Sequence, residues 1–354
     1  MSDWFGAIGL PEVIAGILML ALNAYALTGG ADYGGGVWDL LASGPRRAEQ
    51  RELVASSIAP IWEANHVWLI VVVVMLFTAF PAAFGTLGVV MHIPLTLMLV
   101  GIVLRGSAFV FRSYGSRRRR DARRWGLAFA IASVATPILL GMVIGALASG
   151  AVGQASSRVG AGSFAEVFIR PWLAPFPVAV GLFALALFAF LAAVYLTIEA
   201  RDSTVREDFR RRALLAAGAV CALAAIALGL STGAAPRVAA GVVTAPWSLV
   251  LHILTGVAAL TAIVSLWTRR YRLARLAAGA QVSLILWGWA LAQFPFVIPT
   301  TLTIRQSAAP RVTLELLAAG LAGGAVILLP SLRYLFRTFK GTAAQEAKQR
   351  ASRL

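Results

Sequence analysis

Polar residues that could carry protons interrupt one long apolar stretch of the sequence. The stretch S-S-I-A-P-I-W-E-A-N-H-V-W-L-I covers 56–70 and runs on into V-V-V-V-M-L-F-T-A-F. Glu63, Asn65 and His66 would lie at a depth where hydrocarbon surrounds a membrane helix. An ionisable side chain at that depth is costly and must face protein or water. Glu63 and His66 are three positions apart and share a helix face, which favours a proton-transfer role.

Asp32 and Arg105 are expected to lie near Glu63. Asp32 occurs in A-D-Y-G-G-G and Arg105 in V-L-R-G-S, each late in an apolar span. One interpretation is a proton-conducting group open to the cytoplasm. The other is a buried Asp32–Arg105 ion pair that locks helices together. We favour the ion pair for Asp32 and Arg105, and proton transfer for Glu63, because one arginine cannot neutralise two carboxylates.

The histidines and the cysteine do not predict a metal site. His66, His92 and His252 fall on separate spans, and Cys221 is the only cysteine. A second Glu-x-x-His, which a two-metal site in a helical bundle would need, is absent from the sequence. We therefore expect no metal or haem to be bound by this chain alone, and we interpret His66 as a hydrogen-bonded partner of Glu63.

Composition indicates the elements that must position these residues. The 354 residues are 59% hydrophobic and 13% charged, and the charged share is about half that of soluble domains. We predict an all-α polytopic membrane protein with residues 1–354 in a single membrane domain. The glycines near the end of the first span predict close helix packing there. Nine apolar spans are expected, at 11–40, 53–80, 84–111, 125–148, 173–199, 213–231, 246–268, 274–298 and 313–337.

Basic residues between the spans predict the topology. Arg158, Arg170, Arg237, Arg305 and Arg311 fall on one side, and the other 26 of the 31 Lys and Arg residues fall on the opposite side. Because Lys and Arg remain on the cytoplasmic side, we expect an outer N-terminus and a cytoplasmic C-terminus. This distribution explains the net charge of +16 without a nucleic-acid partner.

A third polar stretch, W-G-W-A-L-A-Q-F-P-F-V-I-P, covers 287–299. Trp289 and Gln293 are four apart and share a face. Aromatic residues near a membrane surface are usually interfacial belt residues, whereas a buried amide needs hydrogen-bond partners. Trp289 and Gln293 are therefore candidates for contact with a ligand or another subunit.

These stretches together resemble subunit II of the cytochrome bd quinol oxidases, including the cyanide-insensitive branch. T-G-G-A-D-Y-G-G-G (28–36), S-I-A-P-I-W-E-A-N-H-V-W-L-I (57–70), the Arg105 segment followed by F-R-S-Y (111–114), and the 287–299 stretch carry the resemblance. The family's complex reduces dioxygen to water with electrons from a quinol. The resemblance implies a bacterial or archaeal cell-membrane protein that is part of an oxidoreductase but not catalytic by itself.

The resemblance also implies fold and partners. Subunit I carries two b haems, haem d and the quinol site. Subunit II has two four-helix bundles plus one helix, holds no haem, and packs against subunit I as a pseudo-symmetric partner that it stabilises. It helps to line the cytoplasmic proton path, and in some members it lines an oxygen route or holds a structural quinone. Single-helix small subunits occur in some members, and membrane lipids surround the complex.

Residue roles follow from the resemblance only where positions match. Glu63 stands at an acidic position of the proton path, and Trp68 at a tryptophan associated with oxygen access. Asp32 and Arg105 occupy the family's acidic and basic positions, and we place Asp32 and His66 beside Glu63 in the path. Gly29-Gly30 stands where many members have Asp-Gly, and His66 replaces a Gln or Glu, so the path here depends more on Glu63.

A second function class is compatible with the same residues. Asp32, Glu63 and Arg105 could form the coupling site of a proton-coupled secondary transporter. Such transporters often show matched broken helices in two halves. The glycine-rich end of the first span has no clear counterpart around the fifth or sixth span, which favours the oxidase subunit.

Overall fold

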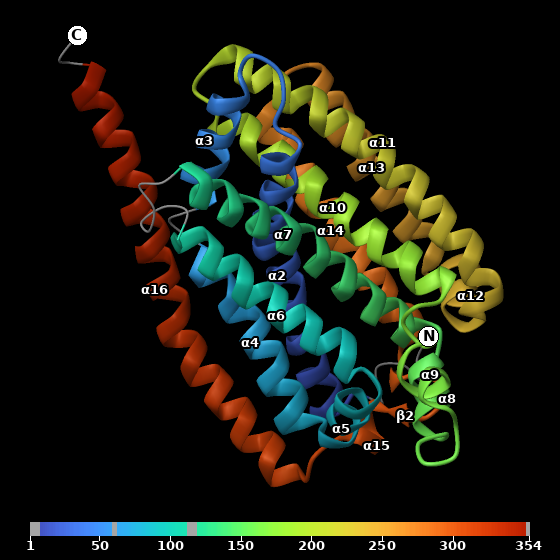
Figure 1. The fold of residues 1–354 in the computed structure, drawn as a ribbon. Helices are drawn as coiled ribbons and strands as arrows, with labels where there is room; N and C mark the ends of the chain where they lie inside the picture. Colours follow the sequence, from blue (N-terminus) through green and yellow to red (C-terminus); the bar gives the residue numbers. More distant parts are fainter. Residues whose placement is uncertain (1–7, 59–61, 112–118, 352–354) are drawn as a thin grey trace.

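Long α-helices make up almost all of the chain that the structure describes (Figure 1). The computed structural model describes residues 8–58, 62–111 and 119–351. The helices are α2 (Leu10–Leu40), α3 (Arg47–Ile58), α4 (Trp62–Ala79), α5 (Pro81–Val90), α6 (His92–Val110), α7 (Arg119–Ala148), α8 (Ala151–Ser156), α9 (Phe164–Phe168), α10 (Pro175–Glu199), α11 (Ser203–Ala234), α12 (Pro236–Thr244), α13 (Ser248–Trp267), α14 (Tyr271–Gln293), α15 (Ile304–Ser307) and α16 (Arg311–Ala351).

The long helices form two four-helix bundles and one additional helix. The first bundle contains α2, α4, α6 and α7, and the second contains α10, α11, α13 and α14. They meet where α10 packs on α2 and α7, while α16 lies along α2 and α4 (Figure 1). Among the described residues, eight helices are long and apolar enough to cross a membrane, or nine if the bent pair α4–α5 is one span. The predicted all-α membrane fold is confirmed.

One difference from the expected spans lies at Phe80. Residues 65–79 and 81–90 form two helices bent by 114°, so residues 84–90 do not begin the third long helix, which starts at His92. Phe80 has a non-helical backbone conformation and Pro81 begins α5. Proline suits that first helical position because its missing N–H would have no partner within the helix.

The eighth span also differs from the prediction at its end. The helix predicted over 274–298 stops at Gln293. The next residues form strand β1 (Phe296–Ile298), which pairs antiparallel with β2 (Leu302–Thr303). Pro295, which cannot donate an amide hydrogen bond, lies between the helix end and the strand.

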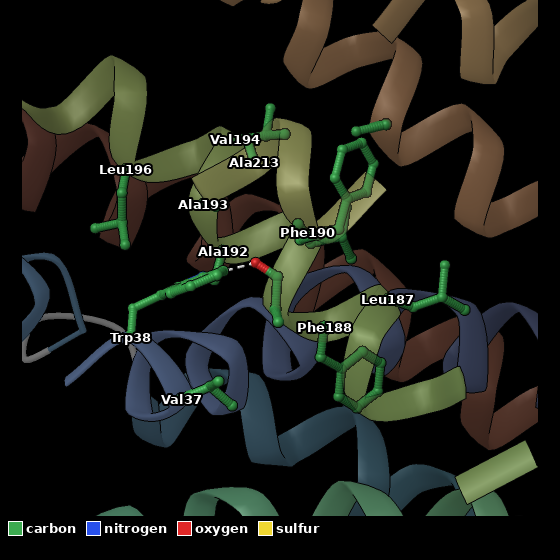
Figure 2. Close-up of a cluster of buried hydrophobic side chains, with 14 of the residues drawn as sticks. Val37, Trp38, Leu187, Phe188, Phe190, Ala192, Ala193, Val194, Leu196 and Ala213 are labelled. Atoms are coloured by element: carbon green, nitrogen blue, oxygen red, sulfur yellow. Dashed lines mark hydrogen bonds between the residues drawn. The ribbon is translucent and has the colours of Figure 1, made fainter. Parts of the chain in front are cut away.

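Glycines allow α2 and α10 to come into close contact, as the sequence predicted. A Cβ atom at Gly34 would lie 1.9 Å from the carbonyl oxygen of Phe188, and one at Gly30 would lie 2.6 Å from its ring. Just beyond this contact, Trp38 Nε1 donates to the carbonyl of Ala189 at 2.8 Å (Figure 2). The polar face of α2 is thereby held in the middle of the first bundle.

Candidate functional site

A buried polar cluster lies where α2, α4, α6 and α7 meet. Its centre is Asp32 on α2, with Asn65 on α4 and Arg105 on α6, and these residues are 4%, 2% and 2% exposed. The Asn65 Nδ2 atom donates to Asp32 Oδ2 at 2.5 Å. Asp32 and Arg105, which the sequence analysis expected near each other, both lie in this cluster, and so does Asn65, to which that analysis assigned no partner.

Arg105 forms hydrogen bonds with Asp32 and Ser133 and lies against two aromatic rings. Its Nη2 atom donates to the main-chain carbonyl of Asp32 at 2.9 Å, and its Nε donates to Ser133 Oγ at 3.1 Å. Its guanidinium carbon lies 4.7 Å from the ring centroid of Tyr33 and 5.1 Å from that of Phe129. A cation over an aromatic face is stabilised by the ring quadrupole. Among the described contacts, Arg105 binds the backbone of Asp32 and not its carboxylate.

His66 joins this cluster through two tyrosines. The Tyr33 hydroxyl lies 3.4 Å from His66 Nε2, and the Tyr25 hydroxyl donates to Tyr33 at 3.3 Å. Both tyrosine rings also meet the imidazole edge to face. Glu63 precedes His66 by three residues on α4, but its side chain lies outside the described part of the chain.

One face of α2 carries a polar stripe, which we define as Tyr25, Asp32 and Asp39. The three residues are seven apart and all buried. Seven residues are close to two helical turns, so the stripe runs along a single face with about 10 Å between neighbours. Asp39 lies near the end of α2, where Arg51 Nε donates to its carbonyl oxygen at 3.1 Å and lies 3.8 Å from Oδ1.

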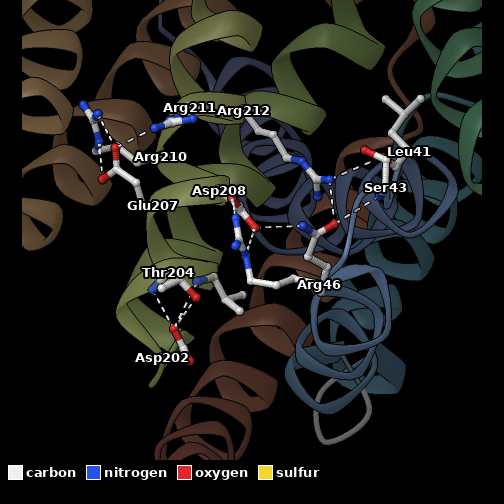
Figure 3. Close-up of polar contacts among 12 residues, drawn as sticks. Leu41, Ser43, Arg46, Asp202, Thr204, Glu207, Asp208, Arg210, Arg211 and Arg212 are labelled. Atoms are coloured by element: carbon white, nitrogen blue, oxygen red, sulfur yellow. Dashed lines mark hydrogen bonds and ion pairs between the residues drawn. The ribbon is translucent and has the colours of Figure 1, made fainter.

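A second polar cluster joins the two bundles at the basic end, defined as the end where α2 and α13 finish and α11 and α14 begin. Arg46 and Asp208 form two hydrogen bonds of 2.9 and 2.6 Å. The buried Gln50 donates to Asp208 and accepts from Arg212 (Figure 3). Hydrogen bonds from the Thr204 hydroxyl and amide hold the pKa of the nearby Asp202 carboxyl below its usual range.

The remaining predicted site residues lie outside both clusters. Trp68 is partly buried against the core around α10. Gln293 donates to the carbonyl of Val297 at 3.0 Å. The buried Gln293 Oε1 and Trp289 Nε1 atoms have no hydrogen-bond partner among the described residues.

The other two histidines lie apart from the cluster. His92 Nδ1 lies 2.8 Å from the carbonyl of Val89, and His252 Nδ1 lies 2.7 Å from that of Ser248. Each nitrogen is therefore within hydrogen-bond distance of its own local backbone. Within the described ranges, no three His, Cys, Asp or Glu side chains converge as a metal site would require.

Sequence reasoning missed several members of the two clusters. Tyr25, Tyr33 and Ser133 have ordinary residue types for a membrane helix, and their roles depend on neighbours from other helices. The seven-residue spacing of Tyr25, Asp32 and Asp39 was a usable signal. The Gln50–Asp208 contact joins residues 158 positions apart, and no local pattern predicts it.

Comparisons with known proteins agree with this architecture. Residues 10–339 match the family described as cytochrome bd terminal oxidase subunit II. A putative cytochrome bd menaquinol oxidase subunit II from Bacillus subtilis (strain 168) is 23% identical over 89% of this chain and 91% of its own length. The cytochrome bd-I ubiquinol oxidase subunit 2 of Escherichia coli (strain K12) is 30% identical over 39% of this chain and 35% of its own length.

A solved structure supports the same fold. A chain of the bd oxidase from Geobacillus thermodenitrificans aligns with a TM-score of 0.75 and 22% identity, covering 94% of this chain and 99% of that chain. The family match extends over nearly all the long helices, including those that carry the polar cluster. This multi-pass chain therefore belongs to the cytochrome bd terminal oxidase subunit II family.

Proposed function

We propose that this chain is the non-haem subunit of a quinol oxidase that reduces dioxygen to water. In this role it stabilises a haem-bearing subunit I and lines a proton path from the cytoplasm. The family membership and the oxidase names of its relatives support the assignment. They also favour it over the transporter that the sequence alone allowed.

The observation that carries the proton-path proposal is the polar stripe of α2 beside α4. Two hydrogen-bonded sets lie within an otherwise apolar bundle: the Asp32 carboxylate with Asn65, and the His66 imidazole with the phenols of Tyr33 and Tyr25. Such groups are retained at membrane depth where protons or ions move. Glu63 lies two residues closer than Asn65 to the start of α4, on the side of the basic end. We place Asp39 near the uptake side and Glu63 and His66 further along the path.

Asp32 has a different role in this proposal. Its carboxylate accepts from Asn65 and its carbonyl accepts from Arg105. Asp32 therefore links α2, α4 and α6, and it fixes the position of the polar stripe relative to α4. Proton transfer through Asp32 itself remains a second role, tested below by comparing yield with activity.

The other components are also proposals. We place the b haems and haem d in subunit I, because this chain belongs to the family of subunit II. Trp68 is proposed to border the oxygen route. The unpartnered atoms of Trp289 and Gln293 support a contact with a quinone or another subunit.

The proposal is tested by purifying the complex through an affinity tag on this chain. We expect a larger haem-bearing polypeptide to be recovered with it, and a reduced-minus-oxidised spectrum that shows b haems and haem d. The same preparation should consume dioxygen when a quinol is supplied. As a control, the oxidase of one of the relatives is prepared from the same membranes by the same protocol. If that oxidase assembles while the tagged chain is recovered intact but colourless, the assignment is contradicted.

A further inference from the structure

A basic pocket at the end of the second bundle has no part in the function proposed above. The pocket has a volume of about 590 Å³ and lies between the start of α11 and the turn from α13 to α14. Four of its eight lining residues are arginines, and none is acidic. The arginines are Arg206, Arg269, Arg270 and Arg272, and Tyr271 and Leu273 lie between or beside them.

Most of this positive charge is not neutralised within the described chain. The side chains of Arg270 and Arg272 form no described hydrogen bond or ion pair, and both residues are exposed. Arg269 lies 3.7 Å from Glu207, whose carboxylate is already bound by two hydrogen bonds from Arg210. The pocket therefore offers an anion several guanidinium groups with free donors, and guanidinium groups match the geometry of phosphate oxygens.

Arg206 forms the fixed wall of the pocket. Its Nη2 atom donates to the carbonyl of Ala200 at 2.5 Å, and its guanidinium carbon lies 5.9 Å from the ring centroid of Tyr271. These contacts fix the guanidinium, yet its Nε atom is buried without a hydrogen-bond partner among the described residues. A buried donor of this kind is normally satisfied by a partner, and an anion in the pocket would supply one.

The turn that presents these arginines has an unusual backbone. Arg269 has a φ of 59°, in the left-handed region where glycine is the usual residue after a helix. The amide of Arg270 closes the turn by donating to the carbonyl of Ser265 at 2.7 Å. Arg270 is also the N-cap of α14 and makes no side-chain cap hydrogen bond, so the first-turn amides receive no acceptor from it.

An apolar surface beside the pocket points to a lipid and not to a soluble anion. Leu273 lines the pocket and is itself exposed, and Leu276 on the following turn of α14 is 72% exposed. Trp267, the last residue of α13, is 71% exposed, in the interfacial position that tryptophan favours in membrane helices. Acyl chains could lie along this surface while the phosphate occupies the arginine pocket.

We infer that this pocket binds the headgroup of an anionic phospholipid, with the phosphate on Arg206, Arg270 and Arg272 and the acyl chains along α13 and α14. Basic pockets between transmembrane helices at a membrane surface bind anionic headgroups in this way. The described lining residues come from α10, the start of α11 and the residues that join α13 to α14, and the site does not depend on the proton path.

The test uses the purified, delipidated complex that contains the full-length chain. Phosphatidylglycerol is titrated in and bound lipid is counted by native mass spectrometry. The Arg270→Gln/Arg272→Gln variant should bind it about 10- to 30-fold more weakly, since each interfacial arginine contributes to anionic-lipid attraction. The control variant Arg47→Gln/Arg333→Gln removes the same charge from exposed positions outside the pocket, and its affinity should stay within about twofold of the unaltered protein.

Two further measurements make the result decisive. Phosphatidylcholine should bind equally to all three proteins, because it carries no net charge. Inorganic phosphate at the concentration of the lipid should not displace phosphatidylglycerol. Equal phosphatidylglycerol affinity in the pocket and control variants would overturn the site. Displacement by inorganic phosphate at equal concentration would overturn the lipid assignment in favour of a free anion.

Discussion

Asp32 receives hydrogen bonds on both its side chain and its main chain. Asn65 donates to the Asp32 carboxylate, and the buried Arg105 donates to the Asp32 main-chain carbonyl. Two aromatic rings complete the surroundings of the guanidinium. Buried charges with several satisfied partners are costly to disturb, so these residues are expected to respond differently from Glu63 when mutated.

Glu63→Ala should slow oxygen consumption while the complex and its haems still assemble. Loss of a positioned proton-transfer group lowers rates by about 100-fold where no alternative route exists, and we expect at least a tenfold loss here. Oxygen uptake per haem measures the effect, and the haem spectrum measures assembly. Glu52→Ala, which removes an exposed carboxylate from α3, is the matched control. Unchanged turnover in Glu63→Ala would remove Glu63 from the mechanism.

Asp32→Ala should lower the yield of the complex more than its specific activity. The change leaves Asn65 without its acceptor and removes the carboxylate charge that interacts with the charge of the buried Arg105. Removing one member of such a buried group typically costs about 3 kcal/mol of stability. Yield is measured by haem content per cell and activity by oxygen uptake per haem. Normal yield with low activity would instead assign Asp32 to proton transfer.

Among the helices, the contact between α2 and α10 positions the polar stripe. The contact brings the α2 backbone at Gly34 against the α10 backbone at Phe188. Because α2 carries Tyr25, Asp32 and Asp39 on one face, a shift of this helix would displace all three residues together. Small residues at such crossings allow van der Waals packing between backbones, which drives helix association in membranes.

Gly34→Ala should therefore destabilise the complex, and Gly16→Ala should not. A Cβ at Gly34 would lie 1.9 Å from a main-chain oxygen that cannot rotate away, whereas nothing lies within 4 Å of a Cβ at Gly16 on the same helix. Overpacking of a core typically costs about 1–3 kcal/mol, and we expect the upper part of that range. Thermal denaturation of the purified complex measures the difference. Equal melting temperatures in the two variants would show that α2 and α10 separate without cost.

For the whole molecule, charge distribution and fold predict the same orientation. The Arg46–Asp208 and Gln50 contacts tie α3 to α11 at the basic end, and the pocket arginines lie at that end as well. Because positive residues are retained on the cytoplasmic side, the basic end should face the cytoplasm. The same argument places the N-terminus on the outer side.

The orientation is tested with reporter fusions at the C-terminus. A fused green fluorescent protein should fluoresce, because the C-terminus is expected in the cytoplasm, and fused alkaline phosphatase should remain inactive there. The control fusion joins alkaline phosphatase after residue 160, between the spans predicted at 125–148 and 173–199 and close to Arg158 on the expected outer side, where it should be active. The reverse pattern would contradict the orientation and move the proposed proton uptake to the opposite side of the membrane.

Much of the fold could be predicted from the sequence, because the hydrocarbon core of a membrane places strict requirements on the segments that cross it. Long apolar segments must be helices, a buried charge must have a partner, and glycines at 29–36 predicted close packing. The helix break at Phe80–Pro81 and the β1–β2 pair depend on a few local residues, and the sequence predicted the helix ends at these two places less accurately. The contacts of Asp32 with Asn65, of Tyr33 with His66 and of Gln50 with Asp208 required the folded chain. These contacts join helices that are far apart in the sequence. The same polar atoms could form hydrogen bonds in several arrangements, and the packing of the folded helices determines which arrangement forms.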